Sequence, residues 1–409
     1  VSYHGAPLQV AGLDDEELGD EELVRARADG FAGISEIARY RGDFEHARET
    51  AHTALELFEK IDDDVGRGDV LNALGSIDAQ TDDFESAKEY YEQALELRRS
   101  IGDTTKIAST LTNLGQVVRS LGQYDVAREY AQTGLQMRRD IQYRWGEALS
   151  LELLSFIELE DGTLEDAERY TRLALDIRRD IGDSMGTASS ANNLARIRLE
   201  RGALDDAREH YENLVEFLDG EQFEWIRGDV HLGLSTVLLE QSAPDAALEH
   251  TDVAADILEQ SESNWVKANA IRARAHLECG DVTTALTLAG EMVDRASGLD
   301  REVQCYSAIS HGLALIADGE TADGLSYLDD AVEMAPTTVL EGHALSQYAD
   351  ALRSAGRPAD ALDALERAAA CFSAVEAGVR ARETTLEALE LAEEVGDESS
   401  VAELEARLD

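Results

Sequence analysis

The stretch LTNLGQVVRSLGQYDVAREYAQTGLQMRRD, residues 111–140, decides the fold, because the chain repeats its pattern at a fixed distance. Residues 71–100 read LNALGSIDAQTDDFESAKEYYEQALELRRS, with the same Leu-Gly pair, a short polar turn in the same place and an Arg-Arg pair near the end. Such a repeat is typical of a solenoid, in which one supersecondary unit stacks on copies of itself. The most regular column of the repeat consists of alanines at steps of 40 residues: Ala47, Ala87, Ala127, Ala167, Ala207 and Ala247.

Each repeat is predicted to form a helix, a turn and a second helix. Apolar residues recur at helical spacing on both sides of the turn, and glycines such as Gly42, Gly122 and Gly202 supply the positive φ that ends a helix. Less regular steps extend the column to Ala285, Gly324 and Ala361. These nine column positions predict nine helix pairs, followed by a helix over 375–395 and a short polar helix over 400–408.

On these residues the chain resembles the tetratricopeptide repeat (TPR) family. The repeat Leu114-Gly115, Gly122-Gln123-Tyr124, Ala127 and Ala131 follows the family pattern, although the family's Trp and Tyr in the first helix are mostly aliphatic here. The period is longer than the usual ~34 residues and resembles that of long TPRs in scaffolds and behind the ATPase domains of signalling regulators. The resemblance implies an all-α solenoid of about nine helix-turn-helix pairs that winds into a right-handed superhelix.

The regularity of the repeats predicts four segments. Residues 1–20 carry acidic side chains without periodicity and are predicted to be a tail or linker. The regular array covers 21–220, a less regular array covers 221–374, and capping helices cover 375–409.

The net charge of −49 comes from 85 acidic and 36 basic residues, of which only four are lysines. This composition resembles that of proteins from salt-loving cells, where concentrated salt screens repulsion between like charges. The alternative is an acidic groove that selects basic partners. Either interpretation argues against direct binding of nucleic acid, which favours a basic surface.

No motif in the chain carries an enzymatic reaction. There is no phosphate-binding loop, no Gly-x-Gly-x-x-Gly and no His-Glu-x-x-His. Cys279, Cys305 and Cys371 are far apart and are expected to be small buried residues in a reducing compartment. The triplet at 62–64, three aspartates, is interpreted as a helix N-cap rather than a metal site. We therefore expect no catalytic residues, no metal and no cofactor.

Two further features follow the repeat. The pairs Arg98-Arg99, Arg138-Arg139 and Arg178-Arg179 end second helices, where they complement the helix dipole or form an anion-binding ridge. Large apolar residues stand just before first helices and either pack between repeats or form a row at the groove mouth: Trp145, Met185, Trp225 and Trp265.

The candidates for ligand binding lie on first helices, which face the concave groove in the family that the chain resembles. There an asparagine holds peptide backbone, and an amide offers the two donors and the acceptor that this needs. Solvent-facing polar filler is the alternative. The candidate residues are Asn72, Asn113, Gln116, Arg119, Asn192, Asn193 and Arg196.

The sequence thus predicts a cytoplasmic scaffold that binds a protein or peptide segment in its groove, without membrane or nucleic-acid contact. No apolar run is long enough for a membrane helix, and no signal peptide is recognisable. The alternative is the sensor or regulatory region of a larger signalling ATPase or transcription regulator. An enzyme has no supporting motif.

Overall fold

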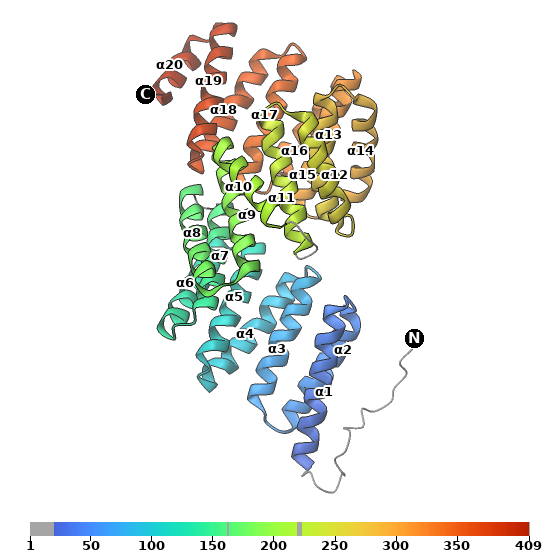
Figure 1. The fold of residues 1–409 in the computed structure, drawn as a ribbon, viewed down its shortest axis with the longest axis vertical. Coiled ribbons are helices and arrows are strands. Elements are labelled where there is room, and N and C mark those ends of the chain that lie inside the picture. Colours follow the sequence, from blue (N-terminus) through green and yellow to red (C-terminus); the bar gives the residue numbers. More distant parts are fainter. Residues whose placement is uncertain (1–19, 162, 219–222, 409) are drawn as a thin grey trace. The chain divides into compact units, whose positions relative to one another are not determined.

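The computed structural model describes residues 20–161, 163–218 and 223–408, and over these residues the chain forms helices and no strands. Figure 1 shows them following one another as an antiparallel series. The twenty helices are α1 (Asp20–Tyr40), α2 (Phe44–Lys60), α3 (Asp64–Gln80), α4 (Phe84–Ile101), α5 (Thr104–Ser120), α6 (Tyr124–Asp140), α7 (Arg144–Asp161), α8 (Leu164–Ile181), α9 (Ser184–Glu200), α10 (Leu204–Phe217), α11 (Glu224–Glu240), α12 (Pro244–Leu258), α13 (Glu262–Glu278), α14 (Val282–Ala296), α15 (Arg301–Asp318), α16 (Thr321–Met334), α17 (Thr338–Ser354), α18 (Pro358–Ala374), α19 (Gly378–Val395) and α20 (Glu398–Leu408).

The predicted helix pairs are confirmed for α1 with α2, α3 with α4, α5 with α6, α9 with α10, α11 with α12, α13 with α14, α15 with α16 and α17 with α18. Helices α7 and α8 occupy the place of the remaining pair in the order of elements. The predicted terminal helices correspond to α19 and α20, and only Leu404 of α20 is buried. None of the helices in the described ranges combines the length and apolar composition that crossing a membrane would need.

The column positions are the points where two helices meet. All eight alanines of the column have no exposed surface, and Gly324 is also buried. A residue without a long side chain lets the two backbones approach, so larger residues pack above and below this contact. The prediction that these positions are interior is confirmed.

The helix ends follow from local sequence. Gly102 has φ +83° and donates its N–H to the carbonyl of Arg98, which closes the last turn of α4. Asp63 is the N-cap of α3 and accepts hydrogen bonds from the N–H groups of Val65 and Gly66. The interpretation of residues 62–64 as an N-cap cluster is therefore confirmed.

The described residues divide into two compact units, one up to Ile157 and one from Glu158, with the division inside α7. The predicted boundary at 220/221 falls at residues 219–222, outside the described residues. The predicted acidic tail, residues 1–20, also lies outside them except for its last residue. Asp20 begins α1, and α19 begins at Gly378, close to the predicted start of the capping segment at 375.

In the first unit, residues 20–157, each first helix packs against its neighbours. The core of the early repeats gathers Leu57, Phe58, Val70, Leu74 and Ile77, and a second cluster around Tyr91 and Leu114 continues it. Helix α3 contacts both α1 and α5, so these three first helices lie side by side.

In the second unit, the last helices of the chain form hydrogen bonds with residues near the beginning of that unit. The N–H of Leu164 donates to the carbonyl of Val375 at 3.1 Å. Arg380 of α19 donates to the carboxylate of Glu240 at 2.8 Å and to the carbonyl of Leu199 at 2.8 Å. His343 lies 2.9 Å from the carboxylate of Glu200. These partners are separated by 140 residues or more along the chain, and one hydrophobic cluster joins Leu164 and Ile197 to helices α17–α20.

Candidate functional site

Helix α5 presents three of the predicted groove residues. Asn113, Gln116 and Arg119 follow at intervals of three residues and therefore share one side of the helix. The opposite side is fixed by buried Leu111, Leu114 and Val118. Gln116 is exposed, and Asn113 and Arg119 are half-buried. The core therefore holds α5 in an orientation that leaves these polar groups accessible.

One cavity of the first unit, of about 250 Å³, lies beside α5 and α7. We call it the Trp145 cavity. Its walls combine polar groups of α5 with aromatic and aliphatic side chains of α7, and its lining consists of Ser109, Thr112, Asn113, Gln116, Arg138, Tyr143, Trp145, Leu149, Glu152, Leu153 and Phe156.

A second cavity, of about 410 Å³, lies on the other side of Asn113 and Gln116. We call it the arginine cavity, because Arg39 of α1 and Arg119 of α5 both line it. The complete lining is Arg39, Ser76, Ala79, Gln80, Phe84, Tyr91, Asn113, Gln116, Val117, Arg119 and Ser120. The two cavities share Asn113 and Gln116 in their linings, and we call the pair of cavities the groove of the first unit.

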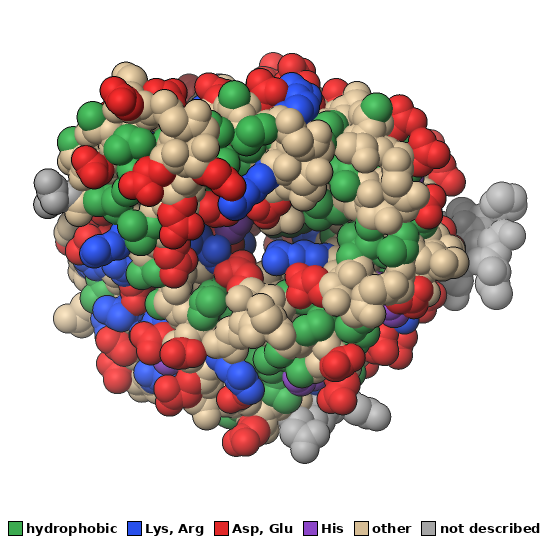
Figure 2. Space-filling view, turned by 90° about the horizontal axis from the view of Figure 1, so that it is seen from above, with side chains coloured by type: hydrophobic (Ala, Val, Ile, Leu, Met, Phe, Trp, Pro, Cys, Tyr) green, Lys and Arg blue, Asp and Glu red, His purple; other side chains and the backbone are tan. Residues whose placement is uncertain are grey.

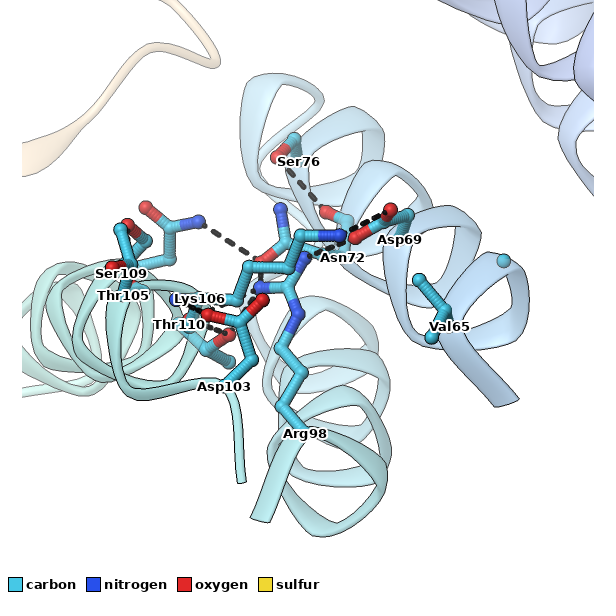
Figure 3. Close-up of polar contacts among 12 residues, drawn as sticks. Val65, Asp69, Asn72, Ser76, Arg98, Asp103, Thr105, Lys106, Ser109 and Thr110 are labelled. Carbon is cyan, nitrogen blue, oxygen red and sulfur yellow. Dashed lines mark hydrogen bonds and ion pairs between the residues drawn. The ribbon is translucent and has the colours of Figure 1, made fainter. Parts of the chain in front are cut away.

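A polar network fixes Asn72 and Asn113 at the edge of this groove (Figure 3). The Oδ1 atom of Asn72 accepts from the guanidinium of Arg98 at 3.0 Å and from the amide of Asn113 at 3.3 Å. Arg98 also donates to Thr110 and Asp69, and Lys106 donates to the other oxygen of Asp69 at 2.7 Å. The structure therefore brings the candidates Asn72 and Asn113 together, with the Oδ1 of Asn72 engaged inside the protein.

The repeated arginines have a role that neither interpretation foresaw. The first arginine of each pair is buried: Arg98, Arg138 and Arg178 are 6%, 3% and 5% exposed. Arg138 donates to Thr112 at 2.8 Å and to Ser150 at 2.6 Å, which joins α6 to first helices on both sides. Burial lowers the pKa of Arg138. These side chains connect consecutive repeats and do not form an anion-binding ridge.

The four large apolar residues of the repeated row differ in their exposure to solvent. Trp145, Met185 and Trp225 are 48%, 49% and 52% exposed, so packing between repeats does not cover them. Trp265 is buried and carries the guanidinium of Arg295 at 3.8 Å from its ring centroid. Trp145 lies in the wall of the cavity named after it, as expected of a residue at the mouth of a groove.

The remaining candidates lie on α9 in the second unit. Asn192 and Asn193 are half-buried, and Arg196 is exposed. The Oδ1 atom of Asn192 is buried and accepts no hydrogen bond from the described residues. Burial alone would raise the pKa of Glu200, one turn beyond Arg196, but His343, Arg380 and Arg196 lower it to about 2.

Sequence reasoning missed Arg39, Tyr91 and Phe156 in the groove. Tyr91 and Phe156 were hidden because apolar and aromatic residues at helical spacing are predicted to be core. No repeated pattern marks Arg39, and only the packing of α1 beside α3 brings it to a cavity shared with α5. Sequence reasoning also missed Arg380 and His343, because each of them contacts a helix that is not a neighbour of its own helix in the repeat pattern.

The described residues do not support a metal site, because no group of three or more His, Cys, Asp or Glu side chains among them could hold a metal ion. Cys305 is buried, and burial raises its pKa to about 12. The expectation of three buried cysteines is wrong for two of them, because Cys279 is exposed at the end of α13 and Cys371 is half-buried.

The acidic residues on one face of the molecule are not gathered into a single patch. On the face shown in Figure 2, acidic side chains are spread among apolar and uncharged ones. Neither cavity of the first unit is strongly acidic: Glu152 is the one carboxylate that lines the Trp145 cavity, and none lines the arginine cavity among the described residues.

Comparisons with known proteins agree with this architecture. The sequence model of the MalT-like TPR region matches residues 34–338, and that of a tetratricopeptide repeat matches residues 309–375. No curated protein matches the sequence.

Two solved structures share the fold. A signal transduction ATPase with numerous domains (STAND) with a TPR sensor, from Pyrococcus horikoshii, has a TM-score of 0.54 and 16% identity over 76% of this chain and 47% of its own. The apo quorum sensor NprR from B. thuringiensis has a TM-score of 0.56 and 12% identity over 87% of this chain and 100% of its own. At such identities the likeness shows the fold alone. The chain spans about half the length (47%) of the STAND protein.

Proposed function

Because the chain belongs to the family of MalT-like TPR regions, we propose that it is a binding region whose first unit holds an extended peptide segment. The observation that carries this proposal is the pair of adjoining cavities that share Asn113 and Gln116. The proposal assigns the chain a binding role in the cytoplasm and no catalytic one.

The chemistry of the groove suits an extended peptide. Such a peptide exposes one N–H and one carbonyl at each residue, and an amide side chain can donate to the carbonyl and accept from the N–H. Gln116 is exposed and lies between the two cavities. Since successive side chains of an extended chain point in opposite directions, a bound segment can keep its backbone at the amides and place side chains in the cavities.

A paired substitution tests this proposal. The double variant Asn113→Ala, Gln116→Ala removes both shared amides, and the control Gln132→Ala, Gln136→Ala removes two exposed amides of α6 that line neither cavity. A randomised, acetylated octapeptide library would be passed over each immobilised protein and the retained peptides identified by mass spectrometry. We expect the original chain and the control to retain the same peptides and the double variant to lose them. Equal retention by a folded double variant would contradict the proposal.

A sensor role within a larger regulator is the second candidate. It is favoured by the likeness to a STAND protein whose TPR part is called a sensor, and to a quorum sensor. The gene sequence on both sides of the chain tests it. A phosphate-binding loop or a DNA-binding motif in the same reading frame would support the sensor role, and a reading frame without any further domain would contradict it.

A further inference from the structure

We propose that the Trp145 cavity selects the ligand of the first unit by taking one aromatic side chain of the bound peptide. This inference rests on the proposed peptide-binding function and adds a chemical requirement for the ligand. It also assigns a role to the indole of Trp145, which is 48% exposed and which packing between repeats does not cover.

The first argument is an apolar stripe on α7 at positions where other first helices are polar. Four lining residues of the cavity follow at intervals of three or four residues and therefore share one side of α7: Trp145, Leu149, Leu153 and Phe156. The last three have polar equivalents forty residues earlier and forty residues later: Ser109, Asn113 and Gln116 on α5, and Ser189, Asn193 and Arg196 on α9. The repeat itself therefore does not require the apolar stripe.

The second argument is that part of this stripe still has apolar surface to offer. Leu153 is buried and packs on α5, where a Cβ atom added at Gly115 would lie 2.7 Å from its Cδ2 atom. Leu149 and Phe156 are only half-buried, and the indole of Trp145 stands beside them in the cavity wall. A ligand that covers these side chains removes apolar surface from water, which stabilises the complex.

The size of the cavity suits a single side chain. Its volume of about 250 Å³ is smaller than the ~300–1,000 Å³ that is usual for sites that hold a whole small molecule. Asn113 and Gln116 line the same cavity. A peptide whose backbone bonds to these amides therefore places a neighbouring side chain against the apolar stripe of α7.

The aromatic residues of the lining favour a ring as the ligand group. The ring centroids of Tyr143 and Trp145 lie 6.1 Å apart with their planes at 40°, and Phe156 adds a third ring to the wall. Aromatic side chains attract one another at such distances, and these contacts add to the effect of burial. An aromatic side chain therefore gains more in this cavity than an aliphatic one of similar size.

The charged residues of the lining do not favour a charged ligand group. Arg138 is 3% exposed, and its Nη1 atom donates to the hydroxyl groups of Thr112 and Ser150. Glu152 also has an interaction partner of its own. Because both residues already have partners, the cavity is expected to prefer a neutral side chain.

Four octapeptide libraries test the proposal, each acetylated and amidated, with random positions restricted to Gly, Ser, Asn and Gln. They differ in one fixed central residue, which is Phe, Leu, Ala or Lys. We expect the Phe library to bind about ten- to a hundredfold more tightly than the Ala library, because burial of a large apolar side chain contributes that much. It should bind about two- to tenfold more tightly than the Leu library, because ring contacts add to burial. Surface plasmon resonance on the immobilised protein measures the four affinities.

Two separate variants, Trp145→Ala and Leu149→Ser, should each remove most of the preference for the Phe library while circular dichroism shows an intact fold. The matched control is Trp225→Ala, because Trp225 occupies the equivalent position of α11, is 52% exposed and lines neither cavity of the first unit. This control should leave the preference unchanged. Since the two variants change different parts of the wall, a folding defect in one leaves the other to decide.

The possible results separate this inference from the proposed function. Binding of the Phe library no tighter than that of the Ala or the Leu library, or tightest binding of the Lys library, would overturn the inference and leave peptide binding intact. A preference for the Phe library that persists in the folded variants would overturn the inference as well. Failure of all four libraries to bind would overturn both.

Discussion

A buried arginine in each of three consecutive repeats shows how a single residue can connect a solenoid. Arg98, Arg138 and Arg178 end second helices and reach the first helix of the following repeat, at Thr110, Ser150 and the carbonyl of Gly186. A buried charge is costly unless its hydrogen bonds are formed, and these partners accept from the terminal Nη1 atoms, although the Nε atoms of Arg98 and Arg138 are buried without a partner among the described residues. The contact is made only when two repeats are stacked, so it belongs to the interface between repeats.

Removing one of these side chains should loosen the interface. We expect Arg138→Ala to lower the free energy of unfolding by ~2–4 kcal/mol, because it leaves a cavity and removes the partner of Thr112 and Ser150. Arg99→Ala, at an exposed position, should change it by less than ~0.5 kcal/mol. Urea unfolding followed by circular dichroism measures both. Equal loss in the two variants would show that the buried position has no special role.

At this scale the sequence predicts positions better than roles. The 40-residue spacing locates Arg138 and its companions, but it does not reveal that the first arginine of each pair turns inward and the second outward. The amides are different, because the side of α5 that carries Asn113 and Gln116 follows from the buried positions of Leu111 and Leu114. Whether those amides bind a peptide stays a prediction.

Helices α15 and α16 approach each other closely at a glycine of the column. In the pair α15 and α16 the column position is Gly324, opposite Gly312 of α15. A Cβ atom on Gly324 would lie 2.6 Å from the carbonyl oxygen of Gly312, and one on Gly312 would lie 2.8 Å from that of Gly324. The Cγ1 atom of Ile316 would also lie 2.5 Å from the Cβ added at Gly324, and the backbone oxygens cannot move aside as a flexible side chain could.

Two glycine substitutions should therefore have opposite effects. Gly324→Ala should lower the free energy of unfolding by ~1–3 kcal/mol, because the added methyl group forces α15 and α16 apart. Gly290→Ala lies in helix α14, where no atom is within 4 Å of the added Cβ, and it should raise stability by ~0.5–1 kcal/mol. Thermal unfolding of both variants, followed by circular dichroism, is the measurement. The argument would be wrong if Gly324→Ala were as stable as Gly290→Ala.

The sequence predicts the helices and the pairs of neighbouring helices, because the repeated residues are the ones that pack within a pair. It does not predict contacts between repeats that are far apart. The sequence pattern around Arg380 and Glu240 does not predict that Arg380 of α19 donates hydrogen bonds to residues near the ends of α9 and α11 in the second unit. Such contacts depend on the accumulated rotation of many repeats, to which each repeat contributes a small and variable amount. The arginine cavity also depends on how successive repeats are placed relative to one another, because residues of α1, α3 and α5 line it together.

The charge of −49 is a property of the whole molecule. Solenoid stability is approximately a sum of contributions from repeats and nearest-neighbour interfaces, so repulsion that acts along the array weakens many interfaces at once. In dilute buffer the Debye length reaches ~30 Å at 0.01 M salt, which exceeds the 8–10 Å between the axes of packed helices; at 1 M it falls to ~3 Å. Salt should therefore matter more to this chain than to a neutral repeat protein.

We expect the melting temperature to rise continuously with potassium chloride from 0.01 M to 1 M, because each increment screens repulsion between repeats while the apolar contacts stay in place. A matched variant separates this effect from a general influence of salt on hydrophobic burial. This variant removes four exposed charges from α4 without changing a buried residue, through the substitutions Glu85→Gln, Glu89→Gln, Glu92→Gln and Glu96→Gln. It should have a higher melting temperature than the original chain in dilute buffer. In molar salt the two melting temperatures should become equal. Differential scanning calorimetry over the salt series measures both curves. Parallel curves would mean that salt acts on burial alone, and melting temperatures independent of salt would remove the physical reason for interpreting the acidic composition as an adaptation to salt.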